Sequence, residues 1–284
     1  MEWWEALVLG LVQGFTEFLP VSSSGHLVLV QEWLGVSSSS SVFFAVMLHL
    51  ATLVSVCVVL YKEIWALLKK PISKPVLCLI IATIPAGIVG LALNDFFDSM
   101  FSGTKWLWLF FLISAIVLFL SDYIGKFYER KGYTNKPQEM KISEDGTIIN
   151  PPLFSTITYT TTICMGLAQA CAIFPGVTRS GSTIAGGIIG KGKRSEVARF
   201  SFLMSIPIIL SSVLLESIKI AKDGVQIDIS VGCIIIGMVS ALVSGYIAVR
   251  WMLRLVEKCQ MKWFSLYLVL LSTLIIVNNF VGLW

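Results

Sequence analysis

Four residues could carry out phosphoryl-transfer chemistry in this chain: Glu17, Ser23, His26 and Arg179. The first three place a carboxylate, a hydroxyl and an imidazole around one turn, which suffices for acid–base or nucleophilic catalysis. Arg179 lies in an apolar segment, where burying a guanidinium is costly and requires a counter-charge. Glu17 is the natural partner, because it is the only carboxylate inside a comparable apolar motif. We therefore predict that these four residues are catalytic.

The sequence leaves two nucleophiles open. Either Ser23 attacks with His26 as its base, or His26 attacks directly while Glu17 orients its ring. The spacing from Ser23 to His26 places both at one helix start, so either could reach the same phosphorus. A hydroxyl at a helix N-terminus already lies beside a bound anion, which favours Ser23. His49 lies in the middle of an apolar span without polar neighbours, and we expect it to be structural.

Two turns rich in Ser, Thr and Gly form the expected anion site. Where a helix begins after residues 22–25, its unpaired N–H groups and the positive end of its dipole face the turn. Residues 178–181 repeat this device with Arg179 inserted. Close packing of membrane helices explains one Ser-Gly turn equally well, but two turns meeting around a guanidinium suit two linked phosphates. The expected substrate-binding residues are Gln13, Ser22, Ser24, Gly25, Thr178, Ser180 and Gly181.

An internal repeat positions these motifs. Residues 10–27 align without a gap on residues 166–183. Glu17 then corresponds to Ile173 and His26 to Ser182, so neither the acid nor the imidazole is needed for packing. The same offset carries the apolar spans 41–61 and 75–94 onto 197–217 and 231–250, the latter within the predicted span 229–250. Spans 105–121 and 262–283 close the two halves.

The solvent around these elements is lipid. The chain is 56% hydrophobic and only 13% charged, with a mean hydropathy of +0.84, and its long charge-free stretches exclude a soluble bundle. Pro and Gly interrupt residues 3–34 and 154–190, which predicts re-entrant helical hairpins, because irregular backbone at membrane depth must be buried in protein or line a wet cavity. The six cysteines show no metal-ligand spacing.

The basic residues set the orientation. With both hairpins re-entrant, 17 of the 21 Lys and Arg lie on one side, in loops 62–74, 122–153, 190–199 and 250–262. That side is then cytoplasmic, and both termini and the site face outward. Because each half has three spans, the second half is inverted. We predict an all-α polytopic membrane protein with two inverted-topology repeats, each a re-entrant hairpin plus three transmembrane helices: residues 1–122 and 154–284, joined by a cytoplasmic loop at 123–153.

At these motifs the chain resembles the bacitracin-resistance (BacA/UppP) family of undecaprenyl-diphosphate phosphatases. The resemblance rests on Gln13 to Glu17, on Pro20-Val21-Ser22-Ser23-Ser24-Gly25-His26 and on Pro175-Gly176-Val177-Thr178-Arg179-Ser180-Gly181. It implies removal of the terminal phosphate of undecaprenyl diphosphate at the outer face of the bacterial plasma membrane, which recycles the lipid carrier for cell-wall synthesis. Gln13 replaces a Glu that many relatives have, and Thr178 replaces a Ser.

The resemblance also implies a divalent cation, Mg²⁺ or Ca²⁺, that bridges the diphosphate oxygens to Glu17, with Gln13 as a further ligand. The expected partners are the polyprenyl diphosphate, membrane lipid and a second copy of the chain in a homodimer, and no nucleic acid. The rival function is a flippase for polyprenyl phosphate. A transporter needs the anion site but not Glu17 with His26, so these two residues favour an enzyme.

Overall fold

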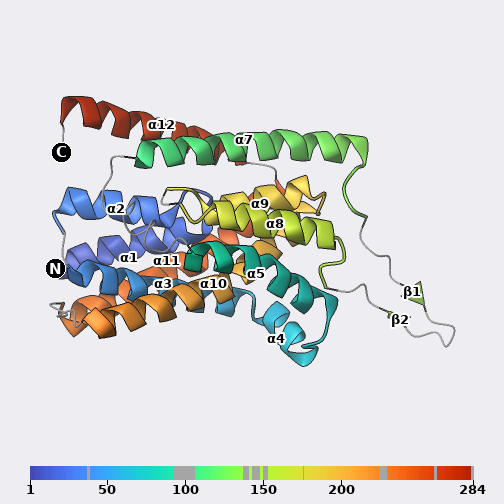
Figure 1. Ribbon diagram of the computed structural model, residues 1–284, viewed down its shortest axis with the longest axis horizontal. Helices are drawn as coiled ribbons and strands as arrows, with labels where there is room; N and C mark the ends of the chain where they lie inside the picture. Colours follow the sequence, from blue (N-terminus) through green and yellow to red (C-terminus); the bar gives the residue numbers. More distant parts are fainter. Residues whose placement is uncertain are drawn as a thin grey trace.

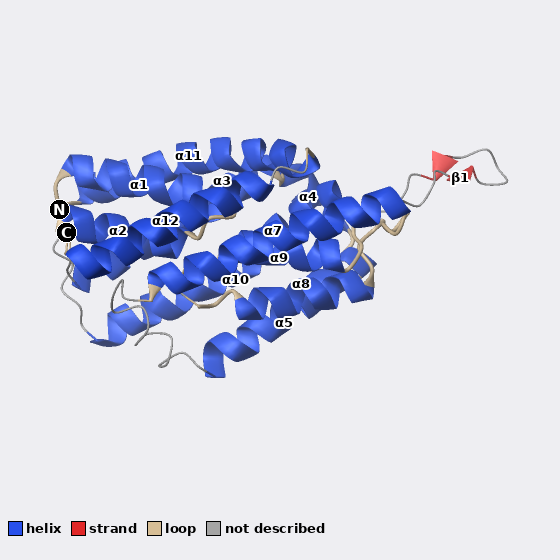
Figure 2. Cartoon of the chain, turned by 90° about the horizontal axis from the view of Figure 1, so that it is seen from above, coloured by secondary structure: helices blue, strands red, loops and turns tan. Residues whose placement is uncertain are grey.

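The computed structural model describes residues 1–36, 39–92, 106–136, 141–142, 148–149, 153–174, 176–223, 229–258 and 261–282. Nearly all of them form α-helices (Figures 1 and 2). The two short strands among them, β1 (Lys141–Ile142) and β2 (Ile148–Ile149), pair antiparallel beyond the end of the helical bundle.

Six helices among the described residues are long and apolar enough to cross a membrane. Each contains a window of at least 18 residues with high hydropathy, which spans roughly 27 Å and is close to the thickness of the hydrocarbon core. The chain is therefore an all-α, multi-pass membrane protein, as predicted. The six helices are α3 (Ser39–Val59), α5 (Lys74–Ala92), α7 (Leu107–Lys131), α10 (Arg194–Asp223), α11 (Val231–Glu257) and α12 (Met261–Val281).

Four shorter helices form two hairpins. The longest of them has 16 residues and is roughly 24 Å long, which is too short to cross the bilayer core. Figure 1 shows α1 and α2 toward the end of the bundle where the N-terminus and the end of α12 lie, and α8 and α9 toward the opposite end. This placement is the one that inverted re-entrant hairpins require. The helices are α1 (Trp3–Phe18), α2 (Ser23–Leu34), α8 (Tyr159–Cys171) and α9 (Arg179–Ile189).

Each hairpin packs against spans of the other half. Helix α1 lies along α11, and α8 lies along α5. Glycines make the close approach possible: a Cβ atom at Gly14 would lie 2.5 Å from the carbonyl oxygen of Ala241, and one at Gly166 would lie 2.9 Å from that of Ala82. Small residues commonly let membrane helices approach in this way. Each half of the chain thus packs its hairpin against a helix of the other half. The inverted symmetry of the two halves stays a prediction.

Two predicted loops are partly helical. Residues 62–74 were expected to be a loop, but α4 (Tyr61–Lys69) occupies most of this segment, and its Glu63 pairs with Arg199 of α10. The loop expected at 123–153 begins only after α7 ends at Gly132, which adopts a left-handed conformation. Charged residues end an apolar span but do not end a helix, because Lys, Glu and Arg are good helix formers.

One buried and one partly buried ion pair hold the part of α7 that lies beyond the apolar span. The guanidinium of Arg194 lies 3.2 Å from the carboxylate of Asp122 and 2.8 Å from that of Glu129. Both Asp122 and Arg194 are buried. These contacts fix the end of α7 against the start of α10, which explains why the helix continues where the sequence predicted a loop.

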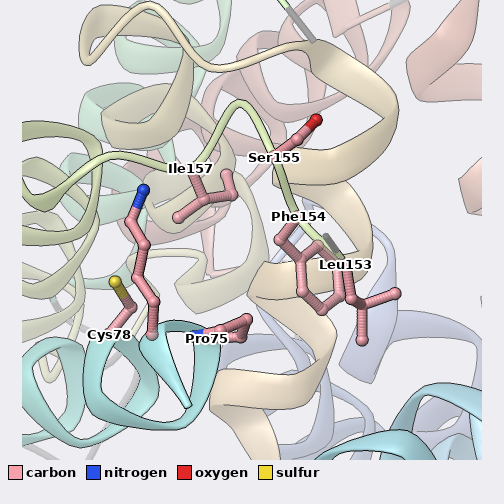
Figure 3. Close-up of a pocket in the computed structure, with 7 residues that line it drawn as sticks. Pro75, Cys78, Leu153, Phe154, Ser155 and Ile157 are labelled. Atoms are coloured by element: carbon pink, nitrogen blue, oxygen red, sulfur yellow. The ribbon is translucent and has the colours of Figure 1, made fainter. Parts of the chain in front are cut away.

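A small cavity of about 110 Å³ lies where α5 and α8 begin (Figure 3). None of the predicted site residues lines it. The cavity is separated from the start of α9 by the length of α8, 13 residues or roughly 20 Å. It is therefore distinct from the predicted anion site. Its lining residues are Lys74, Pro75, Cys78, Leu153, Phe154, Ser155 and Ile157.

Candidate active site

The turn between α1 and α2 meets the turn between α8 and α9 inside the bundle. The Ser180 hydroxyl donates to the carbonyl oxygen of Leu19 at 3.0 Å. A Cβ atom at Gly25 would lie 3.3 Å from the Cα atom of Gly176. The structure therefore brings together the two motifs that the sequence singled out, although more than half of the chain separates them.

The first turn exposes hydrogen-bond donors. Leu19 is extended, as expected before Pro20, whose ring cannot continue helix α1. Ser22 follows with a left-handed φ of 68°, and no side chain caps the start of α2. Within the described part of the chain, the N–H groups of residues 23–25 therefore have no acceptor. Such a helix start is suited to an anion.

The second turn is more fully bonded. The Thr178 hydroxyl accepts a hydrogen bond from the N–H of Gly181 at 3.2 Å and caps helix α9. The N–H of Thr178 itself donates to the Ser114 hydroxyl at 3.0 Å. Thr178, Ser180 and Gly181 were expected to bind substrate, but these contacts show that they first fix the shape of the loop. The second turn thus uses the N–H of Gly181 internally, whereas the N–H groups of residues 23–25 have no acceptor among the described residues.

Glu17 is the centre of the polar cluster. It is buried, and its Oε1 atom accepts a hydrogen bond from Arg179 Nη2 at 2.5 Å. Its Oε2 atom accepts one from the Ser23 hydroxyl at 2.5 Å and another from Gln13 Nε2 at 3.0 Å. The structure thus contains the expected counter-charge for Arg179. It also gives Ser23 a carboxylate partner positioned to take its proton.

Arg179 keeps part of its guanidinium available. Its Nη1 atom is buried and has no hydrogen-bond partner among the described residues. Leaving a buried donor of a charged group unpaired is costly, and a guanidinium binds phosphate oxygens through two parallel N–H groups. Arg179 therefore holds Glu17 through Nη2, while Nη1 remains available to an anion.

His26 lies in the site but differs from both expectations. Its Nδ1 atom lies 2.7 Å from the carbonyl oxygen of Ser22, and its Nε2 atom lies 2.7 Å from the hydroxyl of Tyr267. The ring is therefore not oriented by Glu17, and Ser23 donates to Glu17 instead of His26. The sequence placed the three residues on one turn but could not show which pairs would form, because that depends on the left-handed bend at Ser22.

Two further residues contact the site that the sequence did not assign to it. His49 was expected to be structural, but α3 places its Nε2 atom 3.7 Å from Glu17 Oε2. The expectation that His49 lacks polar neighbours is therefore wrong. Its functional role stays a prediction, in line with the general rule that ionisable residues within a membrane are usually functional. Tyr267 comes from α12, at the far end of the sequence. Nothing in its apolar surroundings distinguishes it from other membrane aromatic residues.

A divalent cation finds few ligands from the protein alone. Among the described residues, no group of three or more His, Cys, Asp or Glu side chains gathers at one point. The Oε1 atom of Gln13 is, however, buried beside Glu17 and has no hydrogen-bond partner in the described part of the chain. Carbonyl and carboxylate oxygens suit Mg²⁺ and Ca²⁺, which prefer six or more oxygen ligands. The residues present therefore fit a cation that takes most of its oxygens from a bound diphosphate and water.

A comparison with known families agrees with the motif resemblance. A family model described as "Bacitracin resistance protein BacA" matches residues 6–274 of the chain. The chain belongs to the BacA family. Every predicted site residue lies within the match, so the cluster around Glu17 is part of the shared BacA region.

Similar members of the BacA family carry one functional name. The chain is 35% identical to an undecaprenyl-diphosphatase of Carboxydothermus hydrogenoformans over 99% of each chain. It is 36% identical to an undecaprenyl-diphosphatase of Bacteroides thetaiotaomicron, over 98% of this chain and 100% of the relative. It is 35% identical to undecaprenyl-diphosphatase 3 of Bacillus cereus, over 99% and 98% respectively. The similarity therefore covers the whole architecture.

Proposed function

We propose that this protein hydrolyses undecaprenyl diphosphate to undecaprenyl phosphate and inorganic phosphate, and so recycles the lipid carrier for cell-wall synthesis. One observation carries the proposal: Glu17 joins a serine hydroxyl, Ser23, to a guanidinium with an unpaired edge, Arg179. The Ser23 hydroxyl as nucleophile, the Glu17 carboxylate as its base and the Arg179 guanidinium as phosphate ligand thus lie together at the uncapped start of α2. The names of the BacA relatives supply the substrate.

In the first step, the Ser23 oxygen attacks the terminal phosphorus of the diphosphate and transfers its proton to Glu17. The bond from that phosphorus to the bridging oxygen breaks, and undecaprenyl phosphate leaves. Arg179 and the N–H groups of residues 23–25 stabilise the charge that gathers on the phosphoryl oxygens. Such preorganised donors commonly make the largest contribution to phosphoryl and acyl transfer.

In the second step, a water molecule attacks the phosphorus of phosphorylated Ser23. The bond from phosphorus to the serine oxygen breaks, inorganic phosphate leaves and Ser23 regains a proton. Glu17 first returns the proton of the first step to the departing serine oxygen and, now a carboxylate again, accepts the proton of the attacking water. That proton is then released to solvent, so Glu17 is ionised for the next cycle. His26 has no proton-transfer role in this scheme, because both of its ring nitrogens are bonded elsewhere.

A divalent cation, Mg²⁺ or Ca²⁺, belongs to the proposal. Glu17 and the unpaired Oε1 atom of Gln13 are the residues that would hold it, together with oxygens of the substrate. When bound, it supplies further charge neutralisation for the diphosphate. Removal by a chelator should abolish turnover of the wild-type protein, and addition of Mg²⁺ or Ca²⁺ should restore it.

We also propose that the site and both termini face outward and that the prenyl chain extends sideways between spans into the bilayer. The distribution of Lys and Arg supports this orientation. All described residues of the site come from one chain, and the expected homodimer stays part of the proposal. In a cysteine-free background, Asp223→Cys should react with an impermeant thiol reagent on intact cells, whereas Lys136→Cys should not.

The function is tested with purified protein in detergent. Phosphate release from undecaprenyl diphosphate and from farnesyl diphosphate is measured with and without chelator, and a Glu17→Gln preparation serves as the inactive control. Release that depends on Glu17 supports the proposal. Release equal to that of the Glu17→Gln preparation would reject hydrolysis and leave a lipid-phosphate transporter as the remaining class.

A further inference from the structure

The hydrogen bonds of His26 define its protonation pattern. A carbonyl oxygen only accepts hydrogen bonds, so the Nδ1 atom, 2.7 Å from the carbonyl oxygen of Ser22, must carry the proton. In the neutral ring the Nε2 atom is then an acceptor, and the Tyr267 hydroxyl, 2.7 Å away, must donate to it. Tyr267 therefore stabilises the tautomer that holds the Ser22 carbonyl.

That carbonyl belongs to a strained turn. Ser22 has a φ of 68°, a conformation that non-glycine residues adopt rarely and at an energetic cost. No side chain caps the helix that follows, and the Ser22 carbonyl accepts from both the Nδ1 atom and the backbone N–H of His26. The imidazole thus holds the turn from its carbonyl side, which leaves the N–H groups of residues 23–25 open toward an anion.

The corresponding turn of the second half shows the contrast. There Thr178, the repeat mate of Ser22, has an ordinary extended φ of −76° and caps its helix with its own hydroxyl. Ser182, the mate of His26, bonds to the Thr178 carbonyl only through its backbone N–H. A turn capped in this way uses one of its donors internally. The first half needs His26, and hence Tyr267, because its turn is kept uncapped.

We infer that Tyr267 is a positioning residue for the reaction: through the tautomer of His26, its hydroxyl sets the shape of the phosphate-binding turn at residues 22–25. The effect of Tyr267 on turnover rests on the proposed function, whereas its effect on the tautomer of His26 does not. Tyr267 lies on α12, so the last span of the second half contributes a hydrogen bond that helps to shape the turn at residues 22–25 in the first half.

Removing the hydroxyl isolates this effect. The rings of His26 and Tyr267 stack, with their centroids 5.7 Å apart and an angle of 15° between their planes. The ring centroid of Phe111 lies 5.4 Å from that of His26. A phenylalanine at position 267 keeps the stacking and loses only the hydrogen bond. Tyr246→Phe is the matched control, because it removes a hydroxyl from α11 that accepts only from Arg250 among the described residues.

The first measurement is nuclear magnetic resonance of the protein labelled with ¹⁵N-histidine, at a pH where the rings are neutral. The chain has two histidines, and a His49→Gln preparation assigns them. We expect His26 to carry its proton on Nδ1. In Tyr267→Phe the Nε2 resonance of His26 should move, and in Tyr246→Phe it should not. A wild-type proton on Nε2 or an unmoved resonance overturns the inference.

The second measurement is function. Tyr267→Phe should lower kcat/KM for farnesyl diphosphate on the order of tenfold, by analogy with the loss of residues that orient metal-binding histidines. Its affinity for inorganic pyrophosphate should fall several-fold, and Tyr246→Phe should match the wild type in both. Wild-type values for Tyr267→Phe overturn the inference. If the wild type itself releases no phosphate, the proposed function fails, and the pyrophosphate affinity alone decides the role of Tyr267.

Discussion

Arg179 donates a hydrogen bond to Glu17 across the meeting point of the two hairpins, although 162 positions separate them in the sequence. Each half of the chain therefore supplies a charge that the other half needs. A buried guanidinium or carboxylate alone would be strongly destabilising at this depth, and breaking such a pair leaves one charge uncompensated. The ion pair thus links the folding of the two hairpins to the assembly of the site.

Glu17→Gln should lower turnover roughly a thousandfold, within the range for loss of a general base. The amide cannot take the Ser23 proton and does not neutralise Arg179. Phosphate release from farnesyl diphosphate measures the effect. Glu32→Gln, which changes an exposed carboxylate of α2, is the matched control and should keep full activity. Retention of more than a tenth of wild-type turnover by Glu17→Gln would contradict the assignment of the base.

Arg179→Lys should fold and insert but lose on the order of a hundredfold in turnover, the scale of removing one transition-state donor. The reason is geometric: an ammonium cannot hold Glu17 and a phosphate through two fixed edges, as a guanidinium can. Arg250→Lys, at an exposed position of α11, controls for the substitution itself. Near-normal activity of Arg179→Lys would reduce Arg179 to a structural counter-ion.

The sequence predicted much of the site because its signals are local or come from the repeat. The broken motifs, the pairing of Glu17 with Arg179 and the six spans follow from residue types, spacing and length. The number of spans depends only on hydropathy, which the bilayer imposes directly. The partner of Arg179 could be predicted because a buried guanidinium requires a counter-charge, and Glu17 is the only carboxylate inside a comparable apolar motif.

The rest of the site depends on how helices rotate and approach, which spacing does not record. His49 reaches Glu17 because α3 presents one face toward α1, and Tyr267 reaches His26 because α12 lies near α2. The partner of Ser23 depends on one left-handed residue, Ser22. An apolar span carries no periodic polar face, so its sequence does not show which side meets the site.

Gly14→Ala should destabilise the protein by about 1–3 kcal/mol, the usual cost of adding a methyl group to a tightly packed contact. The new Cβ atom would lie 2.5 Å from the carbonyl oxygen of Ala241, so α1 must move away from α11. Thermal unfolding in detergent measures the loss. Gly87→Ala is the control, because a Cβ atom there meets no atom within 4 Å. Equal stability of both variants would show that α1 does not need this close approach.

His49→Leu should lower turnover roughly tenfold, which corresponds to about 1.4 kcal/mol of transition-state stabilisation. The Nδ1 atom of His49 donates to the carbonyl oxygen of Ala45, so the Nε2 atom, 3.7 Å from Glu17 Oε2, attracts that carboxylate only when the ring carries a proton on both nitrogens. His49→Gln supplies an amide N–H group that can donate to Glu17 and should retain more activity than His49→Leu. The test is which of the two variants releases phosphate faster. Equal activity of both with the wild type would return His49 to a structural role.

Ser23 is the predicted nucleophile, since its hydroxyl donates to Glu17 and lies at the uncapped start of α2, while His26 is bonded at both ring nitrogens. Ser23→Ala should abolish turnover and leave diphosphate affinity nearly unchanged, because the N–H groups and Arg179 remain. Ser24→Ala is the matched control: it removes the neighbouring hydroxyl and keeps the nucleophile, so slow turnover should persist.

The deciding observation is the intermediate itself. Farnesyl diphosphate labelled with ³²P on the terminal phosphate is mixed with the protein, and the reaction is stopped in acid after a short time. A phosphoserine is stable in acid, whereas a phosphohistidine is lost in acid and survives in base. Acid-stable label that maps to the peptide containing Ser23, and that is absent from Ser23→Ala, is the expected result. Base-stable, acid-labile label at His26 would instead make the imidazole the nucleophile, and the hydrogen bond from Tyr267 would then have to break before each turnover.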